Sequence, residues 1–308
     1  MKKINIIIPV YNEEKSIIEI YNAIQSLKLK YALEYIFVDD GSIDDTLNII
    51  KNISKENKSV KFISFSRNFG HQIALSAGLD YANGDIVIMM DADLQHPVKN
   101  IPDMIKKYND GFKIVQMVKK SQGKRNMFIK FFSFIFYSFL RFFSDINISN
   151  NVSDFRLIDQ KVCRELNKIK EKERFLRGLI QWVGFPYTEI EYSPNERKFG
   201  KSKYNFFKLV KLASNGVFAF STIPLKLSLY FGLTLSFISF IYGLFAIIKK
   251  FLSPYSSPIG YTDLIVFITF LGGIQLIFLG LIGLYISKIF DQVKQRPLYI
   301  INEKNINA

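Results

Sequence analysis

The sequence predicts an α/β domain built on a mostly parallel sheet, followed by two membrane-spanning helices. Short apolar runs alternate with amphipathic stretches along the first half of the chain, as strands and helices do around a parallel sheet. Two later segments, 225–248 and 264–286, each exceed ~20 residues with almost no charge, which is long enough to cross a bilayer. A chain of 308 residues has room for both parts.

Each element of the first half follows from its own apolar pattern. Continuous apolar runs indicate buried strands, and apolar residues at helical spacing, such as Ile17, Ile20 and Ile24, indicate helices. The expected strands, in chain order, are 4–10, 35–38, 60–65, 86–90 and 113–118, and the expected helices are 17–27, 47–53, 71–81 and 98–108. Sheets of this kind bind ligands at the carboxyl ends of their strands.

The segment 128–143 carries Phe and Ile around nearly its whole circumference, with Lys130 and Arg141 near its ends. A buried core helix and an amphipathic helix lying in the membrane interface account for this pattern equally well. The final residues, 303–308, are expected to be frayed.

The net charge of +14 suits either nucleic acid or anionic lipid as a partner. Basic residues concentrate at 119–130 and 197–211, beside long apolar runs, and no zinc-finger spacing or RNA-binding signature is present. We therefore expect a membrane lipid partner and no nucleic acid. The single cysteine, Cys163, excludes an intramolecular disulfide and is expected to be a small packed side chain.

Basic residues also predict the orientation in the membrane. They precede the first span and follow the second, and they outnumber Lys249 and Lys250 in the connecting loop. The positive-inside rule then places the large domain in the cytoplasm, on a protein that crosses the inner (cytoplasmic) membrane twice.

Two of the predicted strands end in carboxylates. Asp39 and Asp40 follow one strand, and Asp91 and Asp93 follow another. Two carboxylates one residue apart can share a hard cation such as Mg²⁺, which fills its other positions with water and substrate phosphates. An acidic turn is the structural alternative, because an isolated Asp-x-Asp is a weak signal.

Further motifs accompany these acidic strand ends. They are Pro-Val-Tyr-Asn-Glu-Glu at 9–14, Asp-Asp-Gly-Ser at 39–42, Ser-Arg-Asn-Phe-Gly-His at 66–71 and Gly-Asp at 84–85. In this combination the sequence resembles the family 2 glycosyltransferases of the GT-A fold, over essentially the whole chain. Asp-Phe-Arg-Leu at 154–157 and the basic stretch 196–204, followed by two spans, resemble the polyprenyl-phosphate glycosyltransferases. That group includes bactoprenol glucosyltransferases and is related to the dolichyl-phosphate mannose synthases.

The resemblance implies a set of donor-nucleotide residues, which are Pro9, Tyr11, Glu13, Val38, Asp40, Asp91, Ala92 and Gln95. Asp40 is expected to accept a hydrogen bond from the base, and Asp93 and Asp91 to hold Mg²⁺ or Mn²⁺. Packing remains the alternative role for Tyr11, and stabilisation of the turn the alternative for Asp39. His96 has no implied role, and a surface position suits it at least as well.

The resemblance also implies which residues act on the sugar and the acceptor. The catalytic set is Asp93, Asp154, Arg197 and Lys203, and the lipid-phosphate set is Lys124, Arg125, Lys130 and Arg156. Family analogy makes Asp154 a general base, but a phosphate monoester has a second pKa near ~6 and is already largely a dianion at neutral pH. We therefore expect Asp154 chiefly to orient the acceptor or Arg156, and a plain ion pair with Arg156 is a further alternative. Solvated surface charge is the alternative for Arg197 and Lys203.

Together these features imply inverting transfer of a hexose to undecaprenyl or another polyprenyl phosphate for modification of a cell-surface glycan. Glucose from UDP-glucose is the first choice of donor; GDP-mannose and other UDP-sugars are alternatives. A nucleotide-sugar-binding membrane protein without turnover is a rival from another class. The implied organisation is a catalytic domain at 1–223, a two-helix anchor at 224–290 and a cytoplasmic tail at 291–308, assembled as a tetramer.

Overall fold

The structure is a computed structural model. It describes residues 2–120, 152–172, 174–195, 228, 230–235, 237, 238, 241, 248 and 261–307. The chain divides into two compact units, of which the first comprises residues 1–209 and 296–308 and the second residues 210–295. The predicted segment 128–143 lies outside the described residues.

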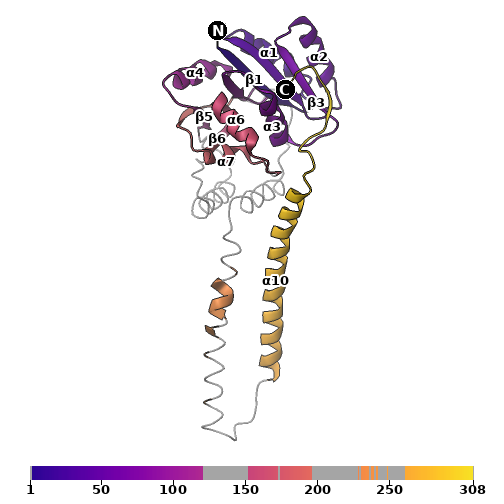
Figure 1. The fold of residues 1–308 in the computed structure, drawn as a ribbon, viewed down its shortest axis with the longest axis vertical. Helices are drawn as coiled ribbons and strands as arrows, with labels where there is room; N and C mark the ends of the chain where they lie inside the picture. The colour runs from indigo at the N-terminus through magenta and orange to yellow at the C-terminus, as the bar shows by residue number, and fades with distance from the viewer. Residues whose placement is uncertain are drawn as a thin grey trace. The chain divides into compact units, whose positions relative to one another are not determined.

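The first unit is built on one sheet (Figure 1). Its strands are β1 Lys3–Val10, β2 Ala32–Asp39, β3 Val60–Phe65, β4 Ile86–Met89, β5 Ile114–Lys119, β6 Val152–Asp159, β7 Tyr187–Tyr192 and β8 Ile301–Lys304. They lie in the order β7-β5-β6-β4-β1-β2-β3-β8. β1 to β4 are mutually parallel and β5 is parallel to β7, whereas β6 and β8 run antiparallel to their neighbours. The predicted α/β domain with a mostly parallel sheet is confirmed.

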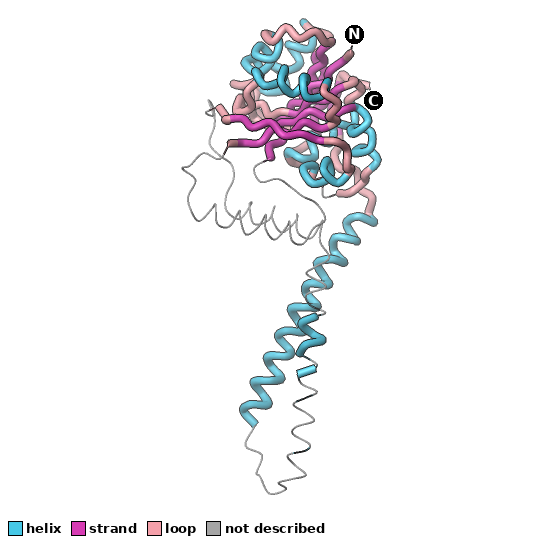
Figure 2. The backbone as a smooth tube through the Cα atoms, turned by 90° about the vertical axis from the view of Figure 1, so that its left-hand side faces the viewer, coloured by secondary structure: helices cyan, strands magenta, loops and turns pink. Residues whose placement is uncertain are grey.

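Helices cover both faces of this sheet (Figure 2). Helices α1 (Ile17–Gln25), α2 (Thr46–Glu56) and α4 (Ile101–Asn109), the last preceded by a 3₁₀ turn at Val98–Asn100, add apolar side chains to one buried cluster. On the opposite face α3 (His71–Tyr81) packs against α6 (Gln160–Lys168), and α7 (Leu176–Trp182) packs against α6. Cys163 of α6 is buried and unpaired, as expected.

β1 explains why the central strands are continuous apolar runs in the sequence. Ile4, Ile6 and Ile8 belong to the cluster beneath α1, whereas Ile7 lies against Gly78 of α3. All four isoleucines are fully buried. A strand covered on both faces is mostly apolar for this reason, and the buried polar side chain of β1, Asn5, is hydrogen-bonded to Glu34 and to Gly84 N.

β6 is the main departure from the predicted topology. All eight of its residues are buried, yet it carries Ser153, Asp154, Arg156 and Asp159. Polar and charged residues interrupt the apolar ones, so the sequence has no continuous apolar run that would reveal this strand. In the sheet β6 separates β4 from β5, two strands that follow each other along the chain.

The end of the chain corrects a second expectation, the frayed tail at 303–308, because the described residues 303–307 are not simply frayed. β8 pairs with β3, with Glu303 opposite Ser64. The Asn305 side chain accepts a hydrogen bond from Phe62 N at 2.5 Å and donates one to the Val60 carbonyl at 3.3 Å. β8 thereby satisfies backbone groups that an open edge at β3 would leave unpaired.

The second unit contains α10 (Tyr261–Val293), which includes the predicted span 264–286. Within the described part of the chain, one helical stretch, Phe270–Val293, is apolar enough to cross a membrane, with a mean hydropathy of 2.0 and none of its residues buried. The other predicted span, 225–248, lies largely outside the described residues, although its described positions are helical. Two spans are therefore not confirmed.

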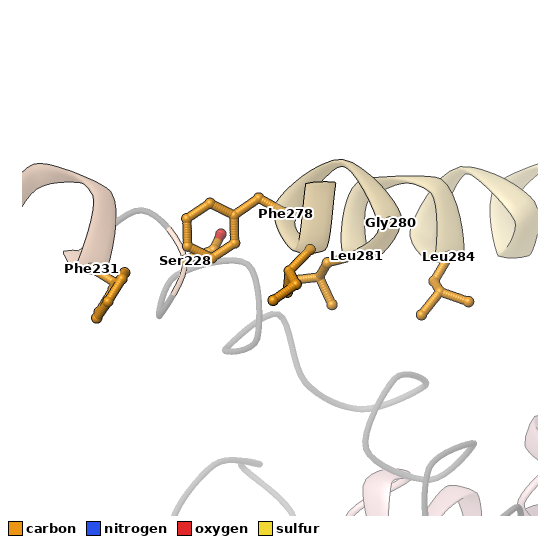
Figure 3. A pocket seen from close by; sticks show the side chains of 7 residues that line it. Ser228, Phe231, Phe278, Gly280, Leu281 and Leu284 are labelled. Carbon is orange, nitrogen blue, oxygen red and sulfur yellow. The ribbon is translucent and has the colours of Figure 1, made fainter. Parts of the chain in front are cut away.

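Side chains of α10, together with Ser228 and Phe231 of the segment 225–248, line an open apolar groove (Figure 3). Phe231 meets Phe278 of α10 edge to face, with ring centroids 6.3 Å apart. Gly280, Leu281 and Leu284 continue the same lining along α10. This surface suits contact with apolar partners, lipid chains included.

Candidate active site

The antiparallel direction of β6 brings two acidic positions of the sequence together. Met89 of β4 pairs with Arg156 of β6, and continuing this register by two residues places Asp91 opposite Asp154. The start of β6 therefore lies beside the carboxyl end of β4. β1, with β2 on one side and β4 on the other, is the point where the strand order reverses, and open α/β sheets bind ligands there.

Asp154 is held by a two-pronged ion pair. Arg177 of α7 donates from Nε to Asp154 Oδ1 at 2.9 Å and from Nη2 to Oδ2 at 2.8 Å. Burial by itself would raise the pKa of Asp154, but the Arg177 guanidinium outweighs burial and holds this pKa well below its usual range. Asp154 is therefore an ionised carboxylate and a weak base.

His71, the first residue of α3, lies between two carboxylates. Its Nε2 is 3.4 Å from Asp91 Oδ1 and 3.5 Å from Asp154 Oδ2. Burial acts to lower the pKa of His71, but Asp91 and Asp154 outweigh this and raise it to about 9. The ring is thus an imidazolium at neutral pH, and it offsets repulsion between the Asp91 and Asp154 carboxylates.

His96 corrects the suggestion of a surface position, because only 1% of its side chain is exposed. Its Nδ1 accepts a hydrogen bond from Asp91 N at 3.0 Å, so Nδ1 carries no proton. Nε2 then holds the proton and faces Ser153 Oγ at 2.9 Å. Burial lowers the pKa of His96, in agreement with a neutral ring. His96 thus links the backbone just after β4 to the Ser153 side chain of β6 beneath the site.

Asp91 and Asp93 have properties that suit a divalent cation. Among the described residues no group donates a hydrogen bond to the buried Asp91 Oδ1, which lies 3.4 Å from His71 Nε2, and Asp93 Oδ1 accepts from Gln95 N at 3.1 Å. Within the described ranges no group of three or more His, Cys, Asp or Glu side chains forms a closed metal cage. A site with one or two carboxylates is what Mg²⁺ uses when substrate phosphates complete its shell.

The turns after β1 and β2 are joined by side-chain hydrogen bonds. Asn12 N donates to Ser42 Oγ at 3.0 Å, and Asn12 Oδ1 accepts from Ile43 N at 2.9 Å. Asp39 accepts from Ser42 N at 3.0 Å and from Ser64 Oγ at 2.8 Å, so Asp39 stabilises the turn.

Asp40 belongs to the turn after β2 and is 4% exposed. Its Oδ1 accepts from Phe69 N at 2.6 Å and its Oδ2 from Gly70 N at 3.0 Å. Burial raises the pKa of Asp40, although these backbone hydrogen bonds oppose the rise. Asp40 therefore ties the end of β2 to the segment 66–70.

Gly41 allows these segments to approach closely. Its φ of +71° disfavours other residues, and a Cβ there would lie 2.6 Å from the backbone carbonyl carbon of Arg67. We expect Gly41→Ala to destabilise the protein by ~1–3 kcal/mol and to weaken nucleotide binding, because the segment 66–70 must shift. Thermal unfolding and calorimetric nucleotide titration measure the two effects. Gly111→Ala, also at positive φ but with open space around it, is the control; equal nucleotide affinity in the two variants would contradict the expectation.

Some of the remaining predicted residues lie within the described part of the chain and the others lie outside it. Pro9, Val38 and Ala92 are buried at strand ends or just beyond them, while Tyr11 and Glu13 are partly buried in the turn after β1. Arg156 is 1% exposed; its Nη2 donates to the Ser153 carbonyl at 2.8 Å and lies 3.7 Å from Asp154 Oδ1. The predicted residues outside the described part of the chain are Lys124, Arg125, Lys130, Arg197 and Lys203.

The family model described as Glycosyl transferase family 2 matches residues 5–166 of the 308. The chain belongs to the family 2 glycosyltransferases. This glycosyltransferase is 42% identical to an uncharacterized glycosyltransferase, YkcC, of Bacillus subtilis (strain 168), over 97% of this chain and 93% of the relative. It is 40% identical to a protein of Shigella phage SfV named bactoprenol glucosyl transferase, over 98% of this chain and 99% of the relative.

Among solved structures, the mannosyltransferase PcManGT from Pyrobaculum calidifontis is similar, with a TM-score of 0.48 and 18% identity. The match covers 68% of this chain and 61% of the PcManGT chain.

Two side chains of the glycosyltransferase site, those of Arg177 and Gln72, were not predicted from the sequence. Arg177 has no place in the motifs, although a charged residue within the apolar run 175–180 is a signal that a buried partner exists. Gln72 also reaches Asp154, at 3.4 Å, and accepts from Leu176 N at 3.3 Å, which joins α3 to α7.

Proposed function

We propose that the enzyme transfers a hexose, in the first place glucose from UDP-glucose, to undecaprenyl or another polyprenyl phosphate. The observation that carries this proposal is the identity of about 40% over nearly the whole chain with proteins named bactoprenol glucosyl transferase. The acidic ends of β2 and β4 agree with it, because a nucleoside diphosphate needs a cation and polar groups at that edge of the sheet. The product would be a lipid-linked sugar for cell-surface glycan modification.

The donor is proposed to lie across the carboxyl ends of β1, β2 and β4. The turn after β1, with Tyr11 and Glu13, lies beside the turn that holds Asp40, so both can line a base and ribose pocket. Each carboxylate oxygen accepts more than one hydrogen bond, so Asp40 keeps acceptor capacity for a base N–H beyond its backbone contacts. Pro9, Val38, Ala92 and Gln95 complete the proposed pocket.

Asp91 and Asp93 would hold Mg²⁺ or Mn²⁺. When bound, such an ion offsets the negative charge that grows on the departing diphosphate. Asn195 N donates to the Gln95 carbonyl at 3.1 Å, and Asn195 Nδ2 donates to the Leu94 carbonyl at 3.1 Å. Asn195, two residues before Arg197, thus contacts the loop after Asp93. This proximity supports Arg197 and Lys203 as further cations for the diphosphate.

The chemistry is proposed to be a single displacement with inversion. The bond from the sugar C1 to the diphosphate oxygen breaks as a bond from C1 to an acceptor phosphate oxygen forms, and no proton must move. Asp154 has no need to act as a base, since the acceptor is largely a dianion above its second pKa of ~6. The bidentate pair between Asp154 and Arg177 suits an orienting role instead.

Asp154→Asn is expected to lower kcat but to leave a measurable rate. In wild type and variant alike, the rate is expected to rise from pH 5.5 to 7 as the acceptor phosphate loses its second proton. Asp154 contributes nothing to this rise, because its pKa lies well below that window. Single-turnover rates across pH measure this. Complete loss of turnover in a folded variant that still binds donor would show that Asp154 is the base.

The acceptor phosphate is proposed to meet Lys124, Arg125 and Lys130, which precede or begin the Phe-rich segment 128–143. Arg156 is buried in the described structure, and burial lowers its pKa to about 10. It would reach the phosphate only through a rearrangement at the start of β6, so the three other cations are the stronger candidates.

We further propose that the catalytic domain, 1–223, works in the cytoplasm on an anchor at 224–290 that crosses the inner membrane twice, with 291–308 as a tail. The apolar stretch of α10 supports membrane attachment. A tetramer is proposed from the family resemblance alone.

The test is a donor panel. Purified full-length protein in detergent is incubated with undecaprenyl phosphate and radiolabelled UDP-glucose, UDP-galactose or GDP-mannose, with and without Mg²⁺ or Mn²⁺. We expect divalent-dependent transfer of glucose to the lipid. Transfer from GDP-mannose or UDP-galactose instead would replace the donor assignment, and no lipid product from any donor would overturn the proposal.

A further inference from the structure

The chain after α10 returns to the sheet at a point next to the proposed base pocket. Ser66 N donates to the Ile300 carbonyl at 3.0 Å, which fastens the segment after β3 to the residues before β8. The Tyr299 ring stacks on Phe65, with centroids 5.0 Å apart and planes 20° from parallel. Tyr299, in the C-terminal segment that leads to β8, therefore packs against the end of β3.

Phe65 links this contact to Asp40. Its ring meets Phe69 edge to face at 5.6 Å, and Phe69 N donates to Asp40 Oδ1 at 2.6 Å. The Arg67 guanidinium lies over the Phe69 ring at 4.3 Å. The segment 65–70 is thus held by the Asp40 carboxylate at one point and by Tyr299 at another.

A second contact fixes the orientation of Tyr299. Its hydroxyl donates to Asp80 Oδ2 of α3 at 2.9 Å. α3 begins directly after the segment 65–70, with Gly70 as its N-cap. Tyr299 consequently contacts the chain on both sides of the residues whose N–H groups bind Asp40.

We propose that Tyr299 is a positioning residue for the donor site, which sets the nucleotide pocket through Phe65, Phe69 and Asp40. This inference rests on the proposed function, because it assigns the Asp40 pocket to the base of the donor. Loss of the ring would let the segment 65–70 relax, and Asp40 would lose the alignment that base recognition needs. Chemistry at the sugar depends on the ends of β4 and β6, which Tyr299 does not contact in the described structure.

The experiment compares Tyr299→Ala and Tyr299→Phe with wild type in the full-length protein. Tyr299→Ala is expected to raise the KM for UDP-glucose about tenfold, the scale of a lost aromatic pair, with kcat and the KM for undecaprenyl phosphate nearly unchanged. Tyr299→Phe keeps the stacked ring and is expected to restore most of the donor KM. Calorimetric titration of UDP and of GDP with Mg²⁺ reports nucleotide affinity without turnover.

Glu303→Ala is the matched control. It removes a 2.6 Å contact between β8 and Lys51 of α2, and the donor KM should stay at the wild-type value. Should Tyr299→Ala not fold, Tyr299→Leu takes its place. Equal rises in both KM values, a fall in kcat alone, or a Phe variant as impaired as the Ala variant would overturn the inference. Absence of transfer by wild type with normal nucleotide affinities would count against the proposed function only.

Discussion

Asp93→Ala is expected to lower the rate of sugar transfer about a thousandfold, because charge stabilisation of a leaving diphosphate is worth several kcal/mol. Asp93 follows β4 at the edge where the strand order reverses, and its Oδ1 orders the next turn through Gln95 N. The effect should be on kcat more than on the acceptor KM. Radiolabel transfer at saturating donor measures it.

A binding measurement separates this effect from misfolding. Calorimetric titration of UDP should gain affinity from Mn²⁺ in wild type and much less in Asp93→Ala. Asp103→Ala, an exposed acidic residue of the first turn of α4, is the control and should behave as wild type. If Asp93→Ala keeps the full gain from Mn²⁺, Asp93 is not a ligand, and an acidic turn becomes the better interpretation.

Arg177→Met is expected to have the largest effect on stability, about 3–5 kcal/mol, because it leaves the buried Asp154 carboxylate without its main cation. The free energy that this pair contributes is present above the unfolded pKa of an aspartate and is lost only as pH falls through the depressed folded value. The destabilisation should therefore be undiminished from pH 6 to 8. Chemical unfolding of the detergent-solubilised protein, followed by circular dichroism, measures it.

The double variant Arg177→Met with Asp154→Asn tests the cause. Removing the charge of Asp154 should return a large part of the lost stability, since no unpaired carboxylate then remains buried. Arg164→Met, on the exposed face of α6, should change stability little. Additive effects of the two substitutions would contradict the ion-pair explanation.

The parallel part of the fold could be predicted because each of its strands and helices has a recognisable pattern within its own short stretch of sequence. The expected strand 60–65 and helix 71–81 match β3 and α3, since a doubly covered strand needs an unbroken apolar run and the helix begins directly after Gly70. The acidic ends of β2 and β4 can also be predicted, because in the sequence the carboxylates follow directly after an apolar run.

The rest of the site depends on pairing between distant segments. β6 mixes polar and apolar residues, and nothing in its own sequence indicates that it lies between β4 and β5. Without that position, the contacts of Asp154 with His71 and Arg177 cannot be foreseen, nor can the burial of His96 beneath them. β8 also depends on a distant segment. Its four residues alternate in exposure and form a strand only by pairing with β3.

The pairing of β8 with β3 has a consequence for biosynthesis. Phe62 and Asn305, which hydrogen-bond to each other, are 243 residues apart. At translation rates of ~5–20 residues per second, the nascent domain waits roughly 10–50 s after β3 is made before β8 leaves the ribosome. Throughout that interval β3 presents an unpaired edge, which is where a chaperone or a neighbouring nascent chain would bind.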